Sequence, residues 1–378
     1  MKTNSDVIII GGGLAGLTGA IHLSKKGLNV ILIEKSEYPR HKVCGEYISN
    51  EILPYLLWLD IDVLQFNPEK ISTFEFTTQN GKIARTKLPL GGFGISRYML
   101  DHILYQKALS NGCIILKETV TDISFDNDEF SVTIPNQILS AKLVLGAFGK
   151  RSNIDQFLSR DFITKKSPWL AVKAHYSGKI PNDIVALHNF NGGYCGVSKV
   201  ENDIINICYL ADYATFKKYK NIEEYQKNVL YKNKHLKSVF ENCNLLFDKP
   251  LTISQISFDK KQPVENHILM IGDSAGLIHP MCGNGMAMAI HSAKIASEMI
   301  LDYHSGKIES RNLLEKSYAK HWKKNFGKRL LMGRLLAKIL TNKTITNGFV
   351  AIVARLPLVL SQIIKQTHGK PIGINKCQ

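Results

Sequence analysis

The chain lacks the features that mark exported, disulfide-bonded or metal-binding proteins. Its 378 residues include seven cysteines, an odd number, at positions 44, 113, 195, 208, 243, 282 and 377. None belongs to a CxxC pair or stands at metal-ligand spacing from a histidine, so we expect neither a disulfide framework nor a metal site. The N-terminus leads directly into an apolar run, which leaves no room for a signal peptide. These absences predict a cytoplasmic protein.

Acidic residues are missing from the end of the chain. Residues 316–378 contain 13 Lys and Arg and no Asp or Glu, whereas the first 315 residues carry 35 basic and 32 acidic side chains. The longest uncharged piece here, residues 344–354, is too short to span about 30 Å of hydrocarbon. We expect either a helical cap on the core or a contact with an anionic membrane surface, at the inner face, or with an acidic partner. Nucleic acid is not expected, because no reader motif accompanies the basic residues.

The first 35 residues contain a dinucleotide-binding pattern. Residues 6–10 have the composition of a buried strand, Gly11-x-Gly13-x-x-Gly16 follows as a turn into a helix, and a second strand ends at Glu34. The three glycines permit the tight turn, the approach of a pyrophosphate and close helix packing, in that order. Glu34 can accept a hydrogen bond from a ribose 2′-hydroxyl. The pattern therefore predicts FAD or NAD as ligand.

The remaining segments predict an α/β protein with a Rossmann-type nucleotide-binding domain that is interrupted in sequence. Apolar runs at residues 142–147 and 267–276 are typical of further parallel strands, while long alternating segments between 152 and 265 indicate an antiparallel sheet. We predict a nucleotide-binding domain (residues 1–70, 92–151 and 266–303), an inserted substrate-binding sheet domain (71–91 and 152–265) and a basic C-terminal helical region (304–378).

A second glycine-rich segment lies far along the chain and decides between the two nucleotides. Asp273 follows an apolar strand, and Gly283 and Gly285 open a long helix. An acid there can hold a ribityl hydroxyl, and a helix N-terminus can present N–H groups to the electron-rich pyrimidine edge of a flavin. The two segments together predict FAD.

Four motifs resemble those of the flavoprotein group that contains geranylgeranyl reductases and, more distantly, aromatic hydroxylases of the p-hydroxybenzoate hydroxylase fold. They are GGGLAG with Glu34, PRHKVCGEY (39–47), GISRYMLDHIL (94–104) and GDSAGLIHPMCGNGM (272–286). Gly276 and the Cys44–Gly45 pair look like the reductase branch. The resemblance implies a tightly bound FAD and a second domain whose sheet faces the flavin.

The resemblance also implies which residues contact the cofactor. The pyrophosphate and adenosine would be bound by Gly11, Gly12, Gly13, Leu14, Ala15, Gly16, Glu34, Lys35, Arg97 and the backbone of Val120. The ribityl chain and flavin ring would be bordered by Cys44, Gly45, Glu46, Gly272, Asp273, Gly283, Gly285 and Met286. One departure concerns the electron donor: the hydroxylases have an Asp-Gly pair where this chain has Phe148. NAD(P)H and a protein donor both remain open.

No residue is a confident catalyst, because the flavin itself supplies the bond chemistry in this class. The candidates are Cys44, Glu46 and His279, each of which could equally be a packing or structural residue. The leading expectation is an FAD-dependent reductase that saturates a carbon–carbon double bond in an isoprenoid, polyene or long-chain aromatic substrate. The alternatives are hydroxylation of an aromatic or alkylphenol substrate, halogenation, which the absence of a WxWxIP-like motif disfavours, and a non-catalytic flavin electron carrier docked at a membrane or partner.

Overall fold

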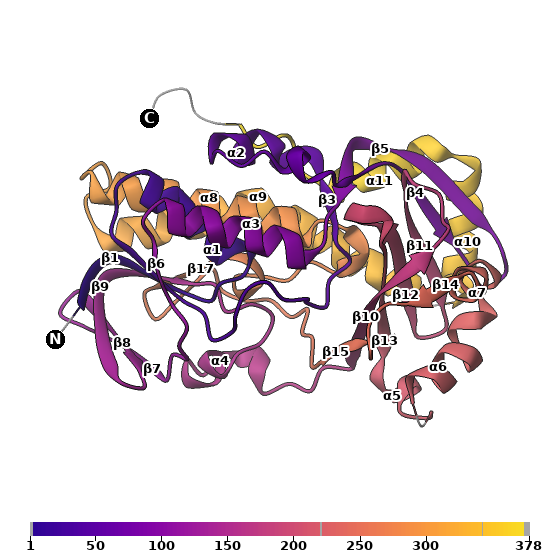
Figure 1. The fold of residues 1–378 in the computed structure, drawn as a ribbon, viewed down its shortest axis with the longest axis horizontal. Coiled ribbons are helices and arrows are strands. Elements are labelled where there is room, and N and C mark those ends of the chain that lie inside the picture. Colours follow the sequence, from indigo (N-terminus) through magenta and orange to yellow (C-terminus); the bar gives the residue numbers. More distant parts are fainter. Residues whose placement is uncertain (1–2, 220, 342, 374–378) are drawn as a thin grey trace.

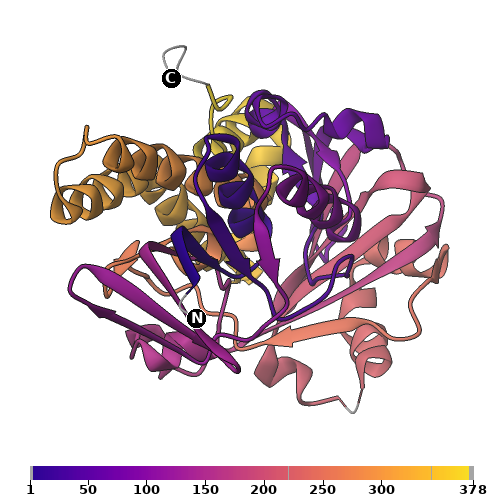
Figure 2. The ribbon, with the colours of Figure 1, turned by 60° about the vertical axis from the view of Figure 1, so that its left-hand side comes forward.

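The computed structural model describes residues 3–219, 221–341 and 343–373 and contains two sheets with helices above and below them in the view of Figure 1. In Figure 2 the orange and yellow C-terminal helices lie on the upper side of the molecule, above the strands. The predicted fold class, a Rossmann-type α/β domain with an inserted antiparallel sheet and a C-terminal helical region, is confirmed.

The first sheet has the strand order β16-β17-β9-β1-β2-β6, in which β17, β9, β1, β2 and β6 are parallel and β16 pairs antiparallel with β17. Every residue from Val7 to Ile10 is buried, as expected for a central strand of a parallel sheet covered on both faces. Helices α1 and α8 pack against one another over this sheet, and α3 packs on α1. The strands are β1 (Thr3–Ile10), β2 (Val30–Ile33), β6 (Ile114–Leu116), β9 (Gln137–Gly146), β17 (Ile268–Met270), β16 (Val264–Glu265) and the antiparallel pair β7 (Asp122–Asp126) and β8 (Glu129–Ile134). The helices are α1 (Leu14–Lys25), α3 (Arg97–Ser110) and α8 (Gly285–His304).

The second sheet is mostly antiparallel, in the order β14-β10-β13-β12-β11-β4-β5-β3, with β15 beside β10. It includes β3, which the sequence-based division had placed with the nucleotide-binding domain. The strands are β3 (Tyr47–Ser49), β4 (Glu69–Thr77), β5 (Ile83–Gly94), β10 (Trp169–Gly178), β11 (Ile184–Phe190), β12 (Gly193–Lys199), β13 (Ile205–Asp212), β14 (Cys243–Leu245) and β15 (Leu251–Ser254). Short helices complete this part of the chain: α2 (Leu53–Trp58), α4 (Asn153–Phe157), α5 (Tyr213–Phe216), α6 (Ile222–Asn228) and α7 (Lys234–Glu241).

The two faces of the second sheet have different neighbours. In β10 the residues Val172, Ala174 and Tyr176 belong to an apolar cluster with α6 and α7, whereas Ala171 belongs to the main core. Because side chains alternate along a strand, Lys173 and His175 share the side of Ala171 and face the first domain. This inner face is the one that contributes to the candidate site.

The helical segment after β13 is divided. Residues 222–241 contain two helices, α6 and α7, which are separated near Asn233. The Asn233 side chain accepts from the backbone of His235 and Leu236 and donates to Thr77 Oγ1 at 2.9 Å. These bonds start a new helix and anchor it to β4, which a helical pattern alone does not reveal.

The C-terminal region forms three helices that pack on the rest of the protein. These are α9 (Arg311–Thr341), α10 (Lys343–Arg355) and α11 (Pro357–Thr367). Helix α9 packs along α8, while α10 and α11 pack on β5 and on α9. Across the described residues, none of the helices combines the length and the apolar character needed to cross a membrane.

Candidate cofactor site

In the turn before α1, one glycine has room for an added β-carbon and the neighbouring glycines have none. Gly11 has a φ of +105°, and a β-carbon added at Gly16 would lie 1.9 Å from the carbonyl oxygen of Gly11. A β-carbon added at Gly13 would meet nothing within 4 Å. No side chain caps the N-terminus of α1, which begins after Gly13. The geometry therefore offers an open backbone surface and unsatisfied helix N–H groups to a phosphate.

The acid at the end of β2 is buried beside this turn. Glu34 accepts from the backbone N–H of Gly12 at 2.8 Å and of Ser36 at 3.0 Å, and Arg40 Nη2 lies 2.9 Å from it. A carboxylate offers about four acceptor sites, so one remains for a ribose hydroxyl. The predicted ribose contact of Glu34 is compatible with this arrangement.

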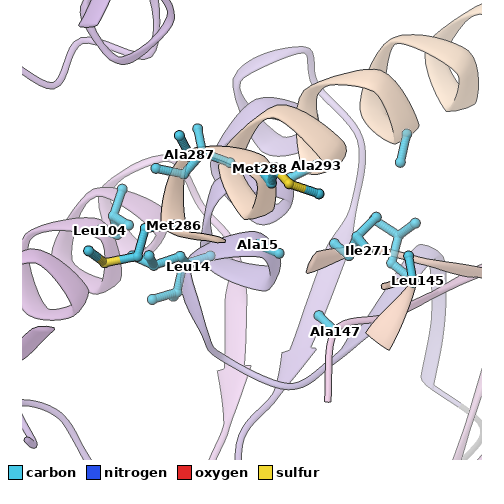
Figure 3. Close-up of a cluster of buried hydrophobic side chains, with 14 of the residues drawn as sticks. Leu14, Ala15, Leu104, Leu145, Ala147, Ile271, Met286, Ala287, Met288 and Ala293 are labelled. Carbon is cyan, nitrogen blue, oxygen red and sulfur yellow. The ribbon is translucent and has the colours of Figure 1, made fainter. Parts of the chain in front are cut away.

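The second glycine-rich segment lies against the first. Gly272 has a φ of +61°, and a β-carbon added there would come within 2.9 Å of the Ala15 side chain. Figure 3 shows Leu14 and Ala15 of α1 between Met286 on one side and Ile271 and Ala147 on the other. The fold thus joins two motifs that are more than 250 residues apart in the sequence.

The N-terminus of α8 also has no side-chain cap. Its N-cap residue, Asn284, instead donates to Glu51 at 3.2 Å and accepts from Arg329 Nη1 at 3.1 Å. Arg329, from α9, also forms an ion pair with the buried Glu51 at 3.1 Å. Because Asn284 is held by these partners, the first N–H groups of α8 stay available to a ligand.

Gly276, in the turn after β17, faces α9. A β-carbon at this position would lie 2.8 Å from the Trp322 ring. A larger residue would therefore displace the Trp322 ring or α9. The glycine typical of the reductase branch thus has a packing reason in this chain.

A group of cations lies near the glycine turn. Arg97 binds Asp101 through two hydrogen bonds of 2.7 and 2.8 Å, and Lys42 lies 2.8 Å from the same carboxylate. Burial would raise the pKa of Asp101, but the charges of Arg97 and Lys42 outweigh it and keep this pKa below its ordinary value. Arg97 is therefore held in place as a cation, as its predicted phosphate contact requires.

The Cys44–Glu46 turn reaches the start of α8. Cys44 Sγ lies 3.5 Å from Met286 Sδ, and its thiol is close enough to Arg97 to interact with it electrostatically. Glu46 has a φ of +55°, in the left-handed region that non-glycine residues seldom adopt. The surrounding contacts must hold this turn in its conformation.

Glu46 is the centre of a fully buried ionic cluster. Its carboxylate accepts from Lys173 Nζ at 3.0 Å and from the backbone of Arg97 at 2.8 Å, and lies 2.6 Å from His175 Nε2. Burial would raise the pKa of Glu46, but the hydrogen bond with His175 and the charge of Lys173 lower it below its ordinary value. Glu46 is consequently ionised at neutral pH, which favours a structural role over the acid/base role considered from the sequence.

His279 is buried in an aromatic cage. The rings of Phe258, Tyr194 and Trp169 surround it at centroid distances of 4.6, 5.9 and 6.1 Å. Burial lowers the pKa of His279 to about 4, so the ring is neutral. Neither ring nitrogen has a hydrogen-bond partner within the described part of the chain. Such buried orphan atoms indicate a place where a ligand can supply the missing bond.

The structure brings together most of the residues predicted from the sequence. Val120 is buried in the segment after β6, the strand next to β2, and Lys35 is exposed. Three features were not predicted: Lys173 with His175, the Arg329–Glu51 pair, and Lys261, whose Nζ donates to the carbonyl oxygens of Lys150 and Asp273 at 2.9 and 2.8 Å. Only the polar residues that interrupt the apolar strand β10 signalled the first of these. No metal-binding group of three or more His, Cys, Asp or Glu occurs among the residues whose positions are given.

Comparisons with known proteins agree with this site. Residues 6–43 match a family described as an FAD binding domain. A digeranylgeranylglycerophospholipid reductase from Methanococcus vannielii is 22% identical over 384 aligned positions, covering 96% of this chain and 93% of its own. The solved structure of a geranylgeranyl bacteriochlorophyll reductase-like protein from Thermoplasma acidophilum has a TM-score of 0.77 at 19% identity, with 97% of both chains covered. The chain is an FAD-dependent oxidoreductase.

This flavoprotein is similar to geranylgeranyl reductases, as its motifs predicted, and FAD is confirmed as its cofactor. Its other relatives include a ubiquinone hydroxylase from Neisseria meningitidis, 24% identical over 348 residues, with 85% of this chain and 74% of that protein covered. A tryptophan 2-halogenase from Chondromyces crocatus and the structure of a flavin-dependent brominase also match. None of these named relatives is described as an electron carrier. The relatives do not fix the reaction.

Proposed function

We propose that this flavoprotein reduces a carbon–carbon double bond in a hydrophobic substrate of isoprenoid, polyene or long-chain aromatic type. The proposal rests on the cage around His279, where rings from the second sheet, Trp169 of β10 and Tyr194 of β12, and the ring of Phe258 pack around a neutral imidazole from the segment before α8. Apolar walls of this kind favour hydrocarbon over charged substrates. The reductases among the relatives support the same reaction class.

The residues of this chain would bind the cofactor at both ends. The open backbone at Gly13 and the cations Arg97 and Lys42 suit a pyrophosphate, and the uncapped start of α8 suits the electron-rich edge of a flavin. Once reduced by an external two-electron donor, the bound cofactor would provide hydride chemistry for one carbon of the double bond, and the second carbon would need a proton from this chain or from water.

Among the three candidate residues, Cys44 is the one whose surroundings best suit a donor of this proton. Glu46 is ionised, with its carboxylate engaged by Lys173 and His175, and His279 is neutral with a low pKa. The thiol of Cys44 lies at the start of α8 and is half-buried. A thiol can transfer a proton to a developing carbanion when it is held next to it.

Hydroxylation of an aromatic or alkylphenol substrate is the second candidate. The neutral His279 can donate one hydrogen bond and accept another, which would suit a phenol hydroxyl in the aromatic cage. The ubiquinone hydroxylase relative favours this alternative.

The product mass distinguishes the two reactions. The FAD-loaded enzyme is incubated without oxygen with dithionite or NAD(P)H and either a polyprenyl lipid or an alkylphenol, and products are analysed by mass spectrometry. We expect a gain of two hydrogens on the polyprenyl lipid. A product that gains one oxygen atom, and only in air, would overturn the proposal in favour of hydroxylation. Dithionite reduces the flavin directly and serves as the positive control, so turnover that is also supported by NADH or NADPH would identify the donor. Cys44→Ala should slow reduction, while Cys195→Ala, a buried cysteine on the opposite face of the second sheet, serves as its control.

A further inference from the structure

The outer sides of the three C-terminal helices carry a concentration of exposed apolar side chains. Leu358 is 82% exposed, the largest fraction among the exposed large apolar residues of the described chain, and Leu331 and Ile352 are 63% and 58% exposed. We call this set the C-terminal apolar face; its members are Leu331, Leu335, Ile352, Leu356, Leu358 and Val359. Soluble proteins rarely expose grouped apolar residues without a binding function.

Basic side chains stand among these apolar residues. Lys328 and Lys338 are exposed on the same α9 segment as Leu331, and Arg355 and Lys365 are exposed in α10 and α11. From residue 316 to the end, the sequence has 13 basic residues and no acidic ones. The face therefore combines apolar side chains with positive charge.

The opposite sides of these helices are fixed to the protein. Arg329 is paired with Glu51, and the carboxylate and carbonyl of Glu51 also accept from the backbone of Gly369 and Ile372. Helices α10 and α11 pack on β5. Because this inner side is already engaged, the C-terminal apolar face cannot be covered by turning these helices inward.

We propose that the C-terminal apolar face docks the enzyme on the surface of an anionic phospholipid bilayer. Apolar residues surrounded by Lys and Arg are the composition that inserts shallowly among anionic headgroups, and each cation near the surface strengthens the attraction. A second copy of the chain is a poorer occupant, because a symmetric contact would bring two acid-free basic regions together. The inference concerns where the enzyme binds and is independent of the reaction it catalyses.

Vesicle sedimentation tests this docking with the full-length, FAD-loaded protein. The probes are vesicles of phosphatidylcholine alone and vesicles in which about one third of the lipid is phosphatidylserine. We expect binding to the anionic vesicles that weakens at high salt and is at least about tenfold weaker with neutral vesicles. Leu358→Asp should reduce the partition coefficient by about tenfold or more, whereas Phe157→Asp, at a 61% exposed apolar residue of α4, should leave it unchanged.

Each other outcome overturns the inference. If the wild-type protein does not bind anionic vesicles, or if Leu358→Asp and Phe157→Asp lower the partition coefficient equally, this face is excluded as the docking surface. If light scattering shows a wild-type dimer that becomes a monomer in Leu358→Asp, and the wild type does not bind vesicles, the face would be assigned to a second copy of the chain instead. If Leu358→Asp does not retain its flavin absorbance, Lys365→Glu replaces it, and undiminished binding of that variant would equally refute the inference.

Discussion

Gly13→Ala should separate cofactor binding from folding. In the structure Gly13 has a φ of −83° and a ψ of −173°, which any residue adopts, and an added β-carbon meets nothing within 4 Å. Alanine is a poorer N-cap than glycine, but it also reduces the entropy of the unfolded chain, and the two effects are of similar size. The free energy of unfolding of the apoprotein should therefore change by less than about 1 kcal/mol.

The same methyl group should weaken FAD binding. It would occupy the open side of the turn, where the pyrophosphate has to approach the backbone. Losing one hydrogen bond to a charged group costs about 1.5 to 3 kcal/mol, which corresponds to about a 10- to 100-fold increase in Kd. The assay is titration of apoprotein with FAD, followed by flavin fluorescence, alongside urea unfolding of the same sample.

Gly16→Ala provides the contrast. Its β-carbon would lie 1.9 Å from the Gly11 carbonyl oxygen, so this variant should lose about 3 kcal/mol of stability. If Gly13→Ala binds FAD as tightly as the wild type, or unfolds as readily as Gly16→Ala, then the pyrophosphate does not lie against this turn and the reasoning is wrong.

Three further variants test the buried polar groups. Lys173→Met should lower the free energy of unfolding by about 3 kcal/mol in urea, because Glu46 loses a buried cation, while the exposed Lys179→Met should have little effect. Burial lowers the pKa of His188 to about 3, so below pH 6.5 the unfolded chain binds a proton at this histidine and the folded chain does not. The contribution of His188 to the free energy of unfolding should therefore fall by up to about 1.4 kcal/mol per pH unit below about pH 6.5. His188→Gln should reduce the pH dependence of stability between about pH 7 and 5, and an unchanged dependence would contradict this prediction. Arg329→Met should both destabilise the protein, by leaving Glu51 without its cation, and weaken FAD binding, by freeing Asn284 to cap α8; FAD affinity equal to that of the wild type would exclude the second effect.

The sequence predicted what depends on local spacing. The glycine turn, the helix behind it and Glu34 lie within one strand–helix–strand unit, so their arrangement follows from the order of residue types. The second cofactor segment could be placed because it repeats the same strand–turn–helix logic. These two units fix the first sheet and both ends of the site.

The rest depends on contacts between distant residues. Glu46 meets Lys173 across 127 positions, and Glu51 meets Arg329 across 278, so neither pair leaves a local pattern. The break between α6 and α7 has the same origin, because Asn233 is held by residues of β4 and β11. In each case a tertiary contact decides what helix and strand propensities leave open.

The Glu46 cluster also limits how the enzyme can move. One carboxylate joins the start of α3 to the middle of β10, so a hinge rotation that parted the two lobes would strand charges in an apolar interior. Large-scale opening is therefore an unfavourable route for reactants. Substrate and product have to enter and leave through smaller displacements of loops and side chains, while the ion pairs of Glu46 stay intact during turnover.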